Sequence, residues 1–299
     1  MKLFRSLVTK KYMLFKKSIF FLALLSLIAC EKNNPDPAWI QVNKWTLVEN
    51  PDSQFPVGEL TQNFTDATVY VDNELIGVFE IPFKIPILKS GTKLIRIYPT
   101  IKNNGISATK KKYPFVEYYE IIGNLIQNQT LEINPVTRYK EFLNIWLEDF
   151  EDAAVKIEND PNSSVQMFTG NNPAILKWGN FYGNVDLTSN DSLWVAYTST
   201  DMTLPKWTET YLEIDYYNTA NIVTGVLAIG SAAINNNQNI QLNKQNETSV
   251  KWKKIYIDLK EIVSNAQNAE YYKMSFQSLL PEGQATGKIC IDNVKVIHF

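Results

Sequence analysis

The sequence predicts an all-β protein: a small β-sandwich followed by a larger antiparallel jelly-roll sandwich. Apolar and polar residues alternate in residues 68–77 and 92–98, which is the pattern of half-buried strands. Further runs of the same kind occupy residues 192–198, 210–217, 223–230, 252–259, 272–277 and 287–297. Asn, Gly and Pro separate these runs and indicate turns. The one helical candidate is residues 259–266, a turn or two long.

The first 29 residues are predicted to be a lipoprotein signal peptide. An apolar stretch follows the basic pair Lys16-Lys17 and ends in Leu27-Ile28-Ala29-Cys30. A small residue directly before a cysteine is typical of lipoprotein cleavage sites, so we expect Cys30 to become a lipid-bearing (palmitate) N-terminus. The alternatives are an ordinary signal peptide or an N-terminal membrane helix, for which the stretch is short.

Removal of the signal makes the chain acidic. Six of the 29 basic residues and none of the 31 acidic ones lie in residues 1–29, so 23 basic residues face 31 acidic ones, a net charge of −8. This balance argues against nucleic acid as a partner, because such binding needs clustered Lys and Arg.

Translation starts at Met1 or at Met13, since residues 13–17 already supply the basic segment of a signal. Residues 30–38 form a predicted tether.

Residues 39–137 are predicted to be the small β-domain. Their strand, turn and glycine pattern in residues 69–77 and 86–97 resembles a PEGA-type domain. The resemblance covers residues 66–99 and implies a small β-sandwich that serves as a spacer or a protein-contact module in the cell envelope.

Residues 138–299 are predicted to be the jelly roll. Three segments, 148–151, 252–259 and 287–296, resemble the galactose-binding-like jelly rolls that include many carbohydrate-binding modules. The resemblance also implies a possible structural calcium ion held by Glu148 or Glu151 together with Asp292, with no other cofactor expected. Carboxylate oxygens from strand ends suit Ca²⁺; the alternative is that these acids cap turns and face water.

Aromatic residues near turns are the candidates for a ligand site. Stacking on a pyranose ring needs an exposed aromatic face, and Trp178, Tyr182 and Trp207 lie in or near predicted turns. Tyr217 is a candidate because alternation puts it on the polar face of a strand with Glu213 and Asp215, opposite the face of Leu212, Ile214 and Tyr216. Most tryptophans in sandwiches are nevertheless buried. Residues 234–240 and 243–246 are rich in Asn and are predicted to form a long loop at one end of the sandwich.

The sequence predicts no enzyme and no catalytic residues. His298 is the only histidine, which excludes Ser-His-Asp and Cys-His arrangements. The remaining cysteine, Cys290, lies in a strand-like run and is expected to be a buried, inert thiol. No pair of carboxylates stands out by spacing as a glycosidase pair.

The lipobox and the Asn-rich, aromatic-rich composition resemble outer-membrane lipoproteins of the Bacteroidota. The sequence therefore predicts a non-catalytic, lipid-anchored outer-membrane protein whose distal jelly roll binds glycan. The alternative is a structural or accessory subunit of an outer-membrane protein assembly. The first hypothesis predicts at least two exposed aromatics in one concave patch, and the second predicts a flat apolar patch or an exposed strand edge. The side of the membrane that the chain faces is left open.

Overall fold

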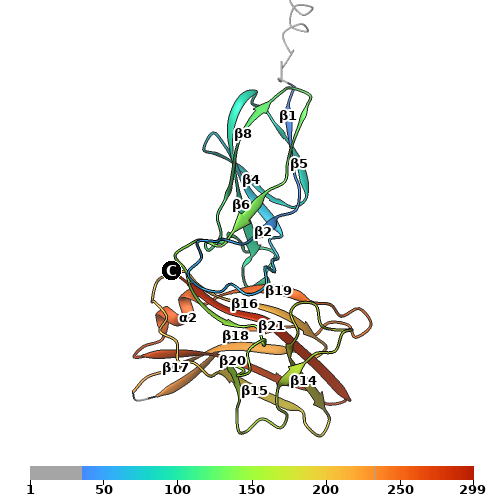
Figure 1. Ribbon diagram of the computed structural model, residues 1–299, viewed down its shortest axis with the longest axis vertical. Coiled ribbons are helices and arrows are strands. Elements are labelled where there is room, and N and C mark those ends of the chain that lie inside the picture. The colour runs from blue at the N-terminus through green and yellow to red at the C-terminus, as the bar shows by residue number, and fades with distance from the viewer. Residues whose placement is uncertain (1–35, 232) are drawn as a thin grey trace, which may run out of the picture.

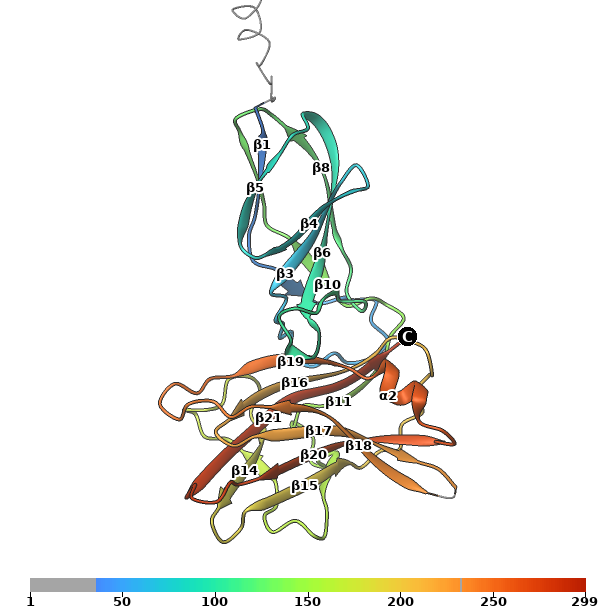
Figure 2. The same ribbon diagram turned by 180° about the vertical axis from the view of Figure 1, so that it is seen from behind.

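The computed structural model describes residues 36–231 and 233–299. The predicted signal peptide and Cys30 lie outside these residues. The described chain forms two β-modules, and the elongated first module contacts one face of the second with one of its ends (Figures 1 and 2). Strand β1 (Ala38–Val42) begins at the end of the first module that is remote from the second. The predicted all-β fold is confirmed.

The first module is a sandwich of short sheets. One layer contains β4 (Glu74–Glu80), β3 (Asp66–Val71), β6 (Gly91–Lys102), β7 (Lys110–Lys112) and β8 (Tyr119–Leu125). The other strands form the sets β5-β1-β9 and β10-β2, with β5 at Phe83–Ile87, β9 at Thr130–Ile133, β10 at Val136–Arg138 and β2 at Thr46–Val48. Strand β10 crosses the predicted domain boundary at 137/138, because Arg138 still pairs with Val48.

The β3–β4 hairpin shows how the sequence directs this module. Its two turn residues, Asp72 and Asn73, have φ angles of 51° and 66°. Two successive residues of positive φ match a type I′ turn, whose twist suits a two-residue hairpin and which favours Asn and Asp. Residues 68–77, whose alternation predicts strand structure, therefore belong to two strands joined by this turn.

The second module consists of two facing antiparallel sheets. The sheet nearer the first module contains β13 (Phe168–Gly170), β14 (Tyr182–Thr188), β21 (Thr286–His298), β16 (Thr210–Asn218), β19 (Lys253–Asp258) and β11 (Asn144–Glu148). The far sheet contains β12 (Ile157–Asn159), β15 (Leu193–Thr198), β20 (Tyr271–Leu279), β17 (Ile222–Ile229) and β18 (Ile234–Leu242). The core between them includes Trp194, Leu212, Ile214, Phe276 and Ile291.

Two predictions about local structure are confirmed, and one is wrong. The predicted helix is α2 (Lys260–Asn265), and Cys290 is buried and free, with burial raising the pKa of its thiol to about 12. Residues 234–240, however, belong to strand β18 and not to a loop. The strand lies at the edge of the far sheet and pairs with β17 only, so Asn235 and Asn236 are exposed, while Asn237 and Asn239 are half-buried.

The first module covers the outer face of the near sheet. Tyr211, Tyr256 and Ile297 point out of the second module and belong to the hydrophobic core of the first. A short 3-10 turn, η1 (Asn103–Gly105), lies against the end of β19: Tyr211 Oη donates to Asn103 Oδ1 at 2.8 Å, and the Asp258 backbone N–H donates to Asn104 Oδ1 at 2.8 Å. The hydrophobic core of the first module therefore continues onto the outer face of the near sheet, and the core between the two sheets of the second module is separate from it. No helix among residues 36–231 and 233–299 is long and apolar enough to cross a membrane.

Candidate functional site

The centre of the junction between the modules is a closed network of charges. Glu213 on β16 is fully buried and forms an ion pair with Lys254 on β19 at 2.7 Å. The Tyr139 hydroxyl donates to both Glu213 oxygens at 3.0 Å, and the Tyr113 hydroxyl donates to one of them. Burial raises the pKa of the Glu213 carboxyl, but the Lys254 and Lys295 ammonium groups outweigh burial and hold it below its usual value. Glu213 is therefore an ionised structural group with no opening to solvent.

Asp215 extends this network toward the solvent. Its carboxylate accepts a hydrogen bond from the Thr61 hydroxyl and lies 3.6 Å from Lys254 Nζ, which also donates to Thr61 at 3.0 Å. Burial raises the pKa of Asp215 above its usual value. Lys295 is also buried and donates to the Glu59 carbonyl at 3.2 Å, and burial lowers its pKa to about 8. The outward face of β16 is thus occupied by contacts with the first module.

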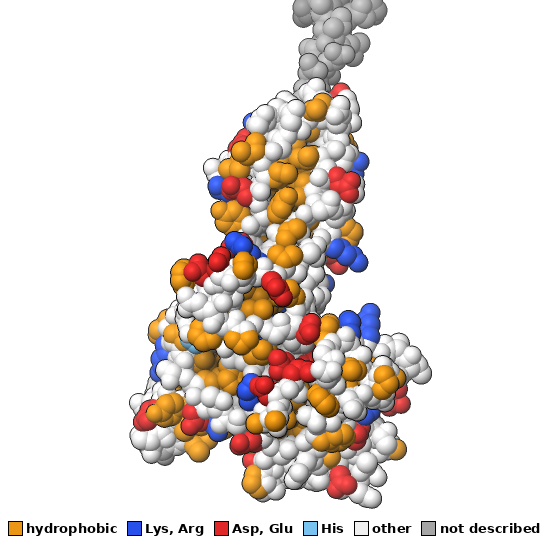
Figure 3. Space-filling model, in the orientation of Figure 1, with side chains coloured by type: hydrophobic (Ala, Val, Ile, Leu, Met, Phe, Trp, Pro, Cys, Tyr) orange, Lys and Arg blue, Asp and Glu red, His pale blue; other side chains and the backbone are white. Residues whose placement is uncertain are grey.

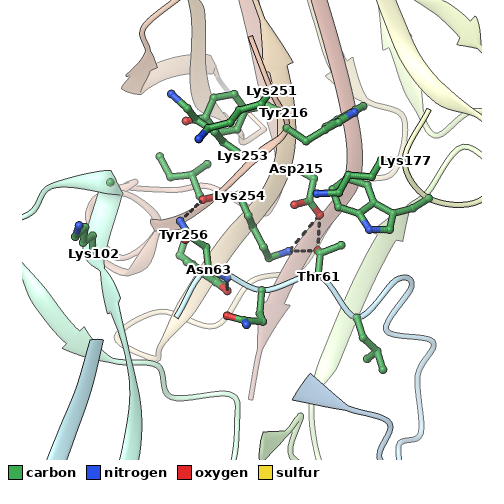
Figure 4. Close-up of a pocket in the computed structure, with 16 residues that line it drawn as sticks. Thr61, Asn63, Lys102, Lys177, Asp215, Tyr216, Lys251, Lys253, Lys254 and Tyr256 are labelled. Carbon is green, nitrogen blue, oxygen red and sulfur yellow. Dashed lines mark hydrogen bonds and ion pairs between the residues drawn. The ribbon is translucent and has the colours of Figure 1, made fainter. Parts of the chain in front are cut away.

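A cavity of about 640 Å³ opens beside this closed centre (Figure 4). The first module contributes residues 60–63 and the segment at Lys102 and Gly105, and the second contributes residues 177–178, 215–216 and 251–256. This volume lies in the range of sites that hold small ligands. We call it the junction cavity.

Two half-buried tryptophans, Trp178 and Trp252, form the aromatic wall of the junction cavity. Their ring centroids are 5.4 Å apart at an interplanar angle of 66°. Tyr182 and Tyr217 pack against Trp252, each with a centroid distance of 6.1 Å, and neither lines the cavity. The structure thus brings together three of the four predicted aromatics, but only Trp178 of them reaches the cavity.

Trp252 lines the cavity but is not among the four aromatic residues predicted from the sequence. It was assigned to a strand, whereas β19 begins one residue later, and Trp252 lies at the mouth of the cavity. Its indole N–H donates to the Ile175 carbonyl at 2.7 Å, which fixes the segment that leads to Trp178. The position of Trp252 directly before a strand, between Lys251 and Lys253, is the sequence signal that indicates an aromatic residue at a surface site.

Glu151 holds the loop that carries Trp178. Its carboxylate accepts hydrogen bonds from the Asn180 backbone N–H at 2.6 Å, the Asn180 side-chain amide at 2.8 Å and the Phe181 backbone N–H at 2.9 Å. Burial raises the pKa of this carboxyl, but these hydrogen bonds outweigh burial and lower it. Glu151 therefore positions Trp178 through the backbone of the loop.

Of the three residues predicted to hold calcium, Glu151 and Asp292 line one small cavity and Glu148 does not. Glu148 accepts hydrogen bonds from the backbone N–H groups of Phe150 and Lys156, one on each oxygen. Glu151 is occupied as described above, although Glu151 and Asp292 both line a smaller cavity of about 230 Å³. No group of three or more His, Cys, Asp or Glu side chains within the described residues is arranged to hold a metal ion.

Trp207, the fourth predicted aromatic, lies in a separate place. Its side chain is 69% exposed, and its φ angle is 62°, which is rare for a bulky residue. The Trp207 backbone N–H donates to Ser264 Oγ at 2.7 Å and keeps this conformation. Trp207 lines a cavity of about 440 Å³ on the other side of η1, so it does not act together with Trp178.

The lining of the junction cavity does not contain the carboxyl pair of a glycosidase. Asp215 is the one carboxylate among its lining residues, and it is engaged by Thr61 and Lys254. A glycosidase of the usual kind needs two carboxyl groups that flank the bond to be cleaved. The arrangement can bind a ligand, but it does not supply an acid and base pair.

Comparison with known proteins gives structural similarities alone. No family model and no curated protein matches the chain. A xylanase 10B fragment of Clostridium thermocellum with a family 22 carbohydrate-binding module is 15% identical over 51% of this chain and 28% of its own, with a TM-score of 0.38. A family 28 module specific for non-crystalline cellulose is 12% identical over 49% of this chain and 91% of its own, with a TM-score of 0.37.

A third similar structure is the family 11 module of the Clostridium thermocellum cellulase Lic26A-Cel5E, which is 13% identical over 52% of this chain and 95% of its own, with a TM-score of 0.34. Similarities this distant carry no argument about what the chain binds. The junction cavity therefore has to be interpreted from its own residues.

Proposed function

We propose that this chain is a non-catalytic glycan-binding protein whose ligand occupies the junction cavity. The observation that supports this proposal is the pairing of Trp178 and Trp252 in the wall of a cavity of about 640 Å³. Indole faces stack on the apolar faces of sugar rings, and a cavity of this size has room for a short oligosaccharide segment. The glycan hypothesis predicts two exposed aromatics in one concave patch, and Trp178 and Trp252 share one cavity wall but are half-buried.

The test is calorimetric titration of the purified chain with a panel of soluble polysaccharides. We expect saturable binding that falls at least about tenfold in Trp252→Ala and in Trp178→Ala, because each loses a stacking surface. Trp207→Ala, a tryptophan outside the junction cavity, is the matched control and should retain full affinity. A melting curve of each variant separates lost binding from lost folding. Equal loss in all three variants would refute the assignment of the site.

We also propose that a lipid on Cys30 anchors the chain to the outer membrane. The support is the lipobox at residues 27–30 together with the position of β1, which starts at the end of the molecule remote from the junction cavity. Cys30→Ala should abolish incorporation of labelled palmitate and move the protein from the membrane to the soluble fraction. A variant that stays membrane-bound would contradict the lipid anchor.

A second candidate function, that of an accessory subunit of an outer-membrane assembly, is favoured by the outer face of the far sheet. Val195, Val223 and Leu227 are half-buried there, and Leu279 is 59% exposed. Such a face, bordered by the edge strand β18, suits contact with a protein. A photo-crosslinker at position 223 should capture a discrete partner in intact outer membranes if this candidate holds, and one at position 44 serves as the control.

A further inference from the structure

The junction cavity gathers lysines that have no acidic partner. Lys102, Lys177, Lys251 and Lys253 line it, and none of the four forms an ion pair with a carboxylate of the described residues. Lys111 differs, because it pairs with Glu209 at 2.7 Å and with Asp258 at 2.9 Å. Lysines elsewhere, such as Lys44 and Lys84, also lack a carboxylate partner among the described residues, so the distinguishing feature of the four is that they line one cavity.

These lysines come from three segments and surround the cavity. Lys102 ends β6, Lys177 precedes Trp178, and Lys251 and Lys253 flank Trp252. Figure 4 shows Lys102 and Lys177 at opposite sides of the cavity and the other two along a third side. In the space-filling view, basic side chains also lie beside a group of acidic ones at the junction (Figure 3). Lys177 Nζ lies 4.6 Å from the Trp178 ring centroid, which holds its charge next to the aromatic wall.

The uncharged polar groups of the cavity are largely engaged. Gln62 donates its amide to the Trp45 carbonyl at 3.1 Å and accepts from the Phe64 backbone N–H at 2.7 Å. Asn63 donates its amide to the Lys254 carbonyl at 2.9 Å. The groups free to contact a ligand are therefore mainly the lysine ammonium groups and the indole faces. A ligand that satisfies four ammonium donors carries negative charge and oxygen acceptors.

We propose that the ligand of the junction cavity is an acidic glycan, a polysaccharide that carries carboxylate or sulfate groups on its sugar rings. This inference rests on the proposed glycan-binding function and names the ligand class for the same site. The indoles stack on the sugar rings, and the lysines neutralise the acidic groups of the glycan. Binding therefore relieves both the repulsion among the lysines and the repulsion among the acidic groups. A neutral glycan would leave four like charges around it uncompensated.

The test compares two matched pairs of polysaccharides by calorimetry. Polygalacturonate is paired with its full methyl ester, and dextran sulfate with dextran, so that each pair differs in charge and the two pairs distinguish carboxylate from sulfate. We expect the acidic member of at least one pair to bind at least about tenfold more tightly, with affinity that falls as NaCl rises from about 0.1 M to about 1 M.

Two triple variants locate the effect. Lys177→Gln, Lys251→Gln and Lys253→Gln together should reduce the affinity for the acidic glycan at least about tenfold. The control variant removes the same charge from other surfaces by combining Lys44→Gln, Lys84→Gln and Lys244→Gln. Its affinity for the acidic glycan should change less than about twofold. Equal losses in both triple variants would overturn the proposal, since the binding would then follow overall charge.

The outcomes separate this inference from the proposed function. If neutral and acidic members bind alike and Trp252→Ala removes both, glycan binding at the junction stands and the acidic ligand class is refuted. If none of the four polysaccharides and no member of the wider panel binds, the proposed function fails and the inference fails with it. Tight binding of the acidic members that Trp252→Ala leaves intact refutes the junction cavity as the acidic site.

Discussion

The junction between the modules has a closed centre and an open rim, and strand β19 supplies lysines to both. Lys254 points to the centre, where its side chain is 2% exposed and paired with Glu213. Lys251 and Lys253, at alternate positions of the same segment, are exposed and unpaired. The alternation of a strand thus divides identical side chains into a structural set and a set free to bind. Burial and pairing, and not residue type, distinguish the two.

The largest expected effect comes from breaking the closed centre. Lys254→Met leaves the Glu213 carboxylate buried without its cation and should lower the free energy of unfolding by about 3–5 kcal/mol. Urea denaturation measures the loss. Lys253→Met, one residue away on the rim, should change it by less than about 0.5 kcal/mol. Similar values for the two variants would remove the distinction between centre and rim.

The second effect concerns pH, because Asp292 is buried close to the junction. Burial, together with the nearby Asp215, Asp149 and Glu151 carboxylates, raises its pKa to about 8, although a hydrogen bond from the Asn293 backbone N–H lowers it. Between pH 4 and 8 the folded protein then binds more protons at this site than the unfolded chain, so Asp292 lowers stability progressively as pH rises. Asp292→Asn should be more stable than the wild type at pH 8 by a few kcal/mol, with the difference vanishing toward pH 4.

Denaturation curves of both proteins across this pH range measure the difference. Lys295 affects the pH dependence of the free energy of unfolding in the opposite direction. Its pKa in the folded state is about 8, below the usual 10.5, so its contribution to stability rises from about pH 8 upward. A pH-independent difference between Asp292→Asn and the wild type would contradict the assigned pKa.

A smaller effect is expected from the loop that carries Trp178. Gly179 has a φ angle of 55°, and a Cβ at this position would overlap Glu151 Oε1. Gly179→Ala should lower the free energy of unfolding by about 2 kcal/mol and weaken glycan binding, because the Glu151 contacts that position Trp178 are displaced. Gly283→Ala, at a φ angle of 83° with no neighbour within 4 Å, isolates the cost of the backbone conformation. If Gly179→Ala binds glycan with the affinity of the wild type, the loop does not position Trp178 for binding.

The smallest effect is expected for calcium. The Glu148 and Glu151 carboxylates are occupied by backbone and amide donors, so millimolar CaCl₂ or EDTA should leave the melting temperature unchanged. Differential scanning calorimetry in both solutions measures this. A rise on adding calcium that Asp292→Asn abolishes would restore the predicted metal site.

The fold could be predicted from sequence where local chemistry decides the structure. Asp72-Asn73 specifies a hairpin turn by its backbone preference, and the run at 287–297 becomes β21 with Cys290 buried. Residues 234–240 were misassigned because an edge strand paired on one side tolerates Asn, which local propensity assigns to loops.

The site was predicted in part, because alternation shows which face a residue occupies and not what covers that face. Glu213 and Asp215 were correctly placed opposite Leu212 and Ile214, yet the first module covers them. Positions in or near turns indicate Trp178 and Tyr182, and strand alternation indicates Tyr217. Trp252 was missed because its role depends on contacts between segments distant in sequence.

The placement of β1 has a mechanical consequence. The strand runs from the remote end of the first module toward the junction, antiparallel to β5 and parallel to β9. A pull on residue 36 directed away from a ligand held at the junction acts along the strand axis, and its backbone hydrogen bonds lie across that axis. These bonds are loaded together in shear and do not open one by one, so the first module would resist tension between the proposed lipid anchor and the proposed ligand site.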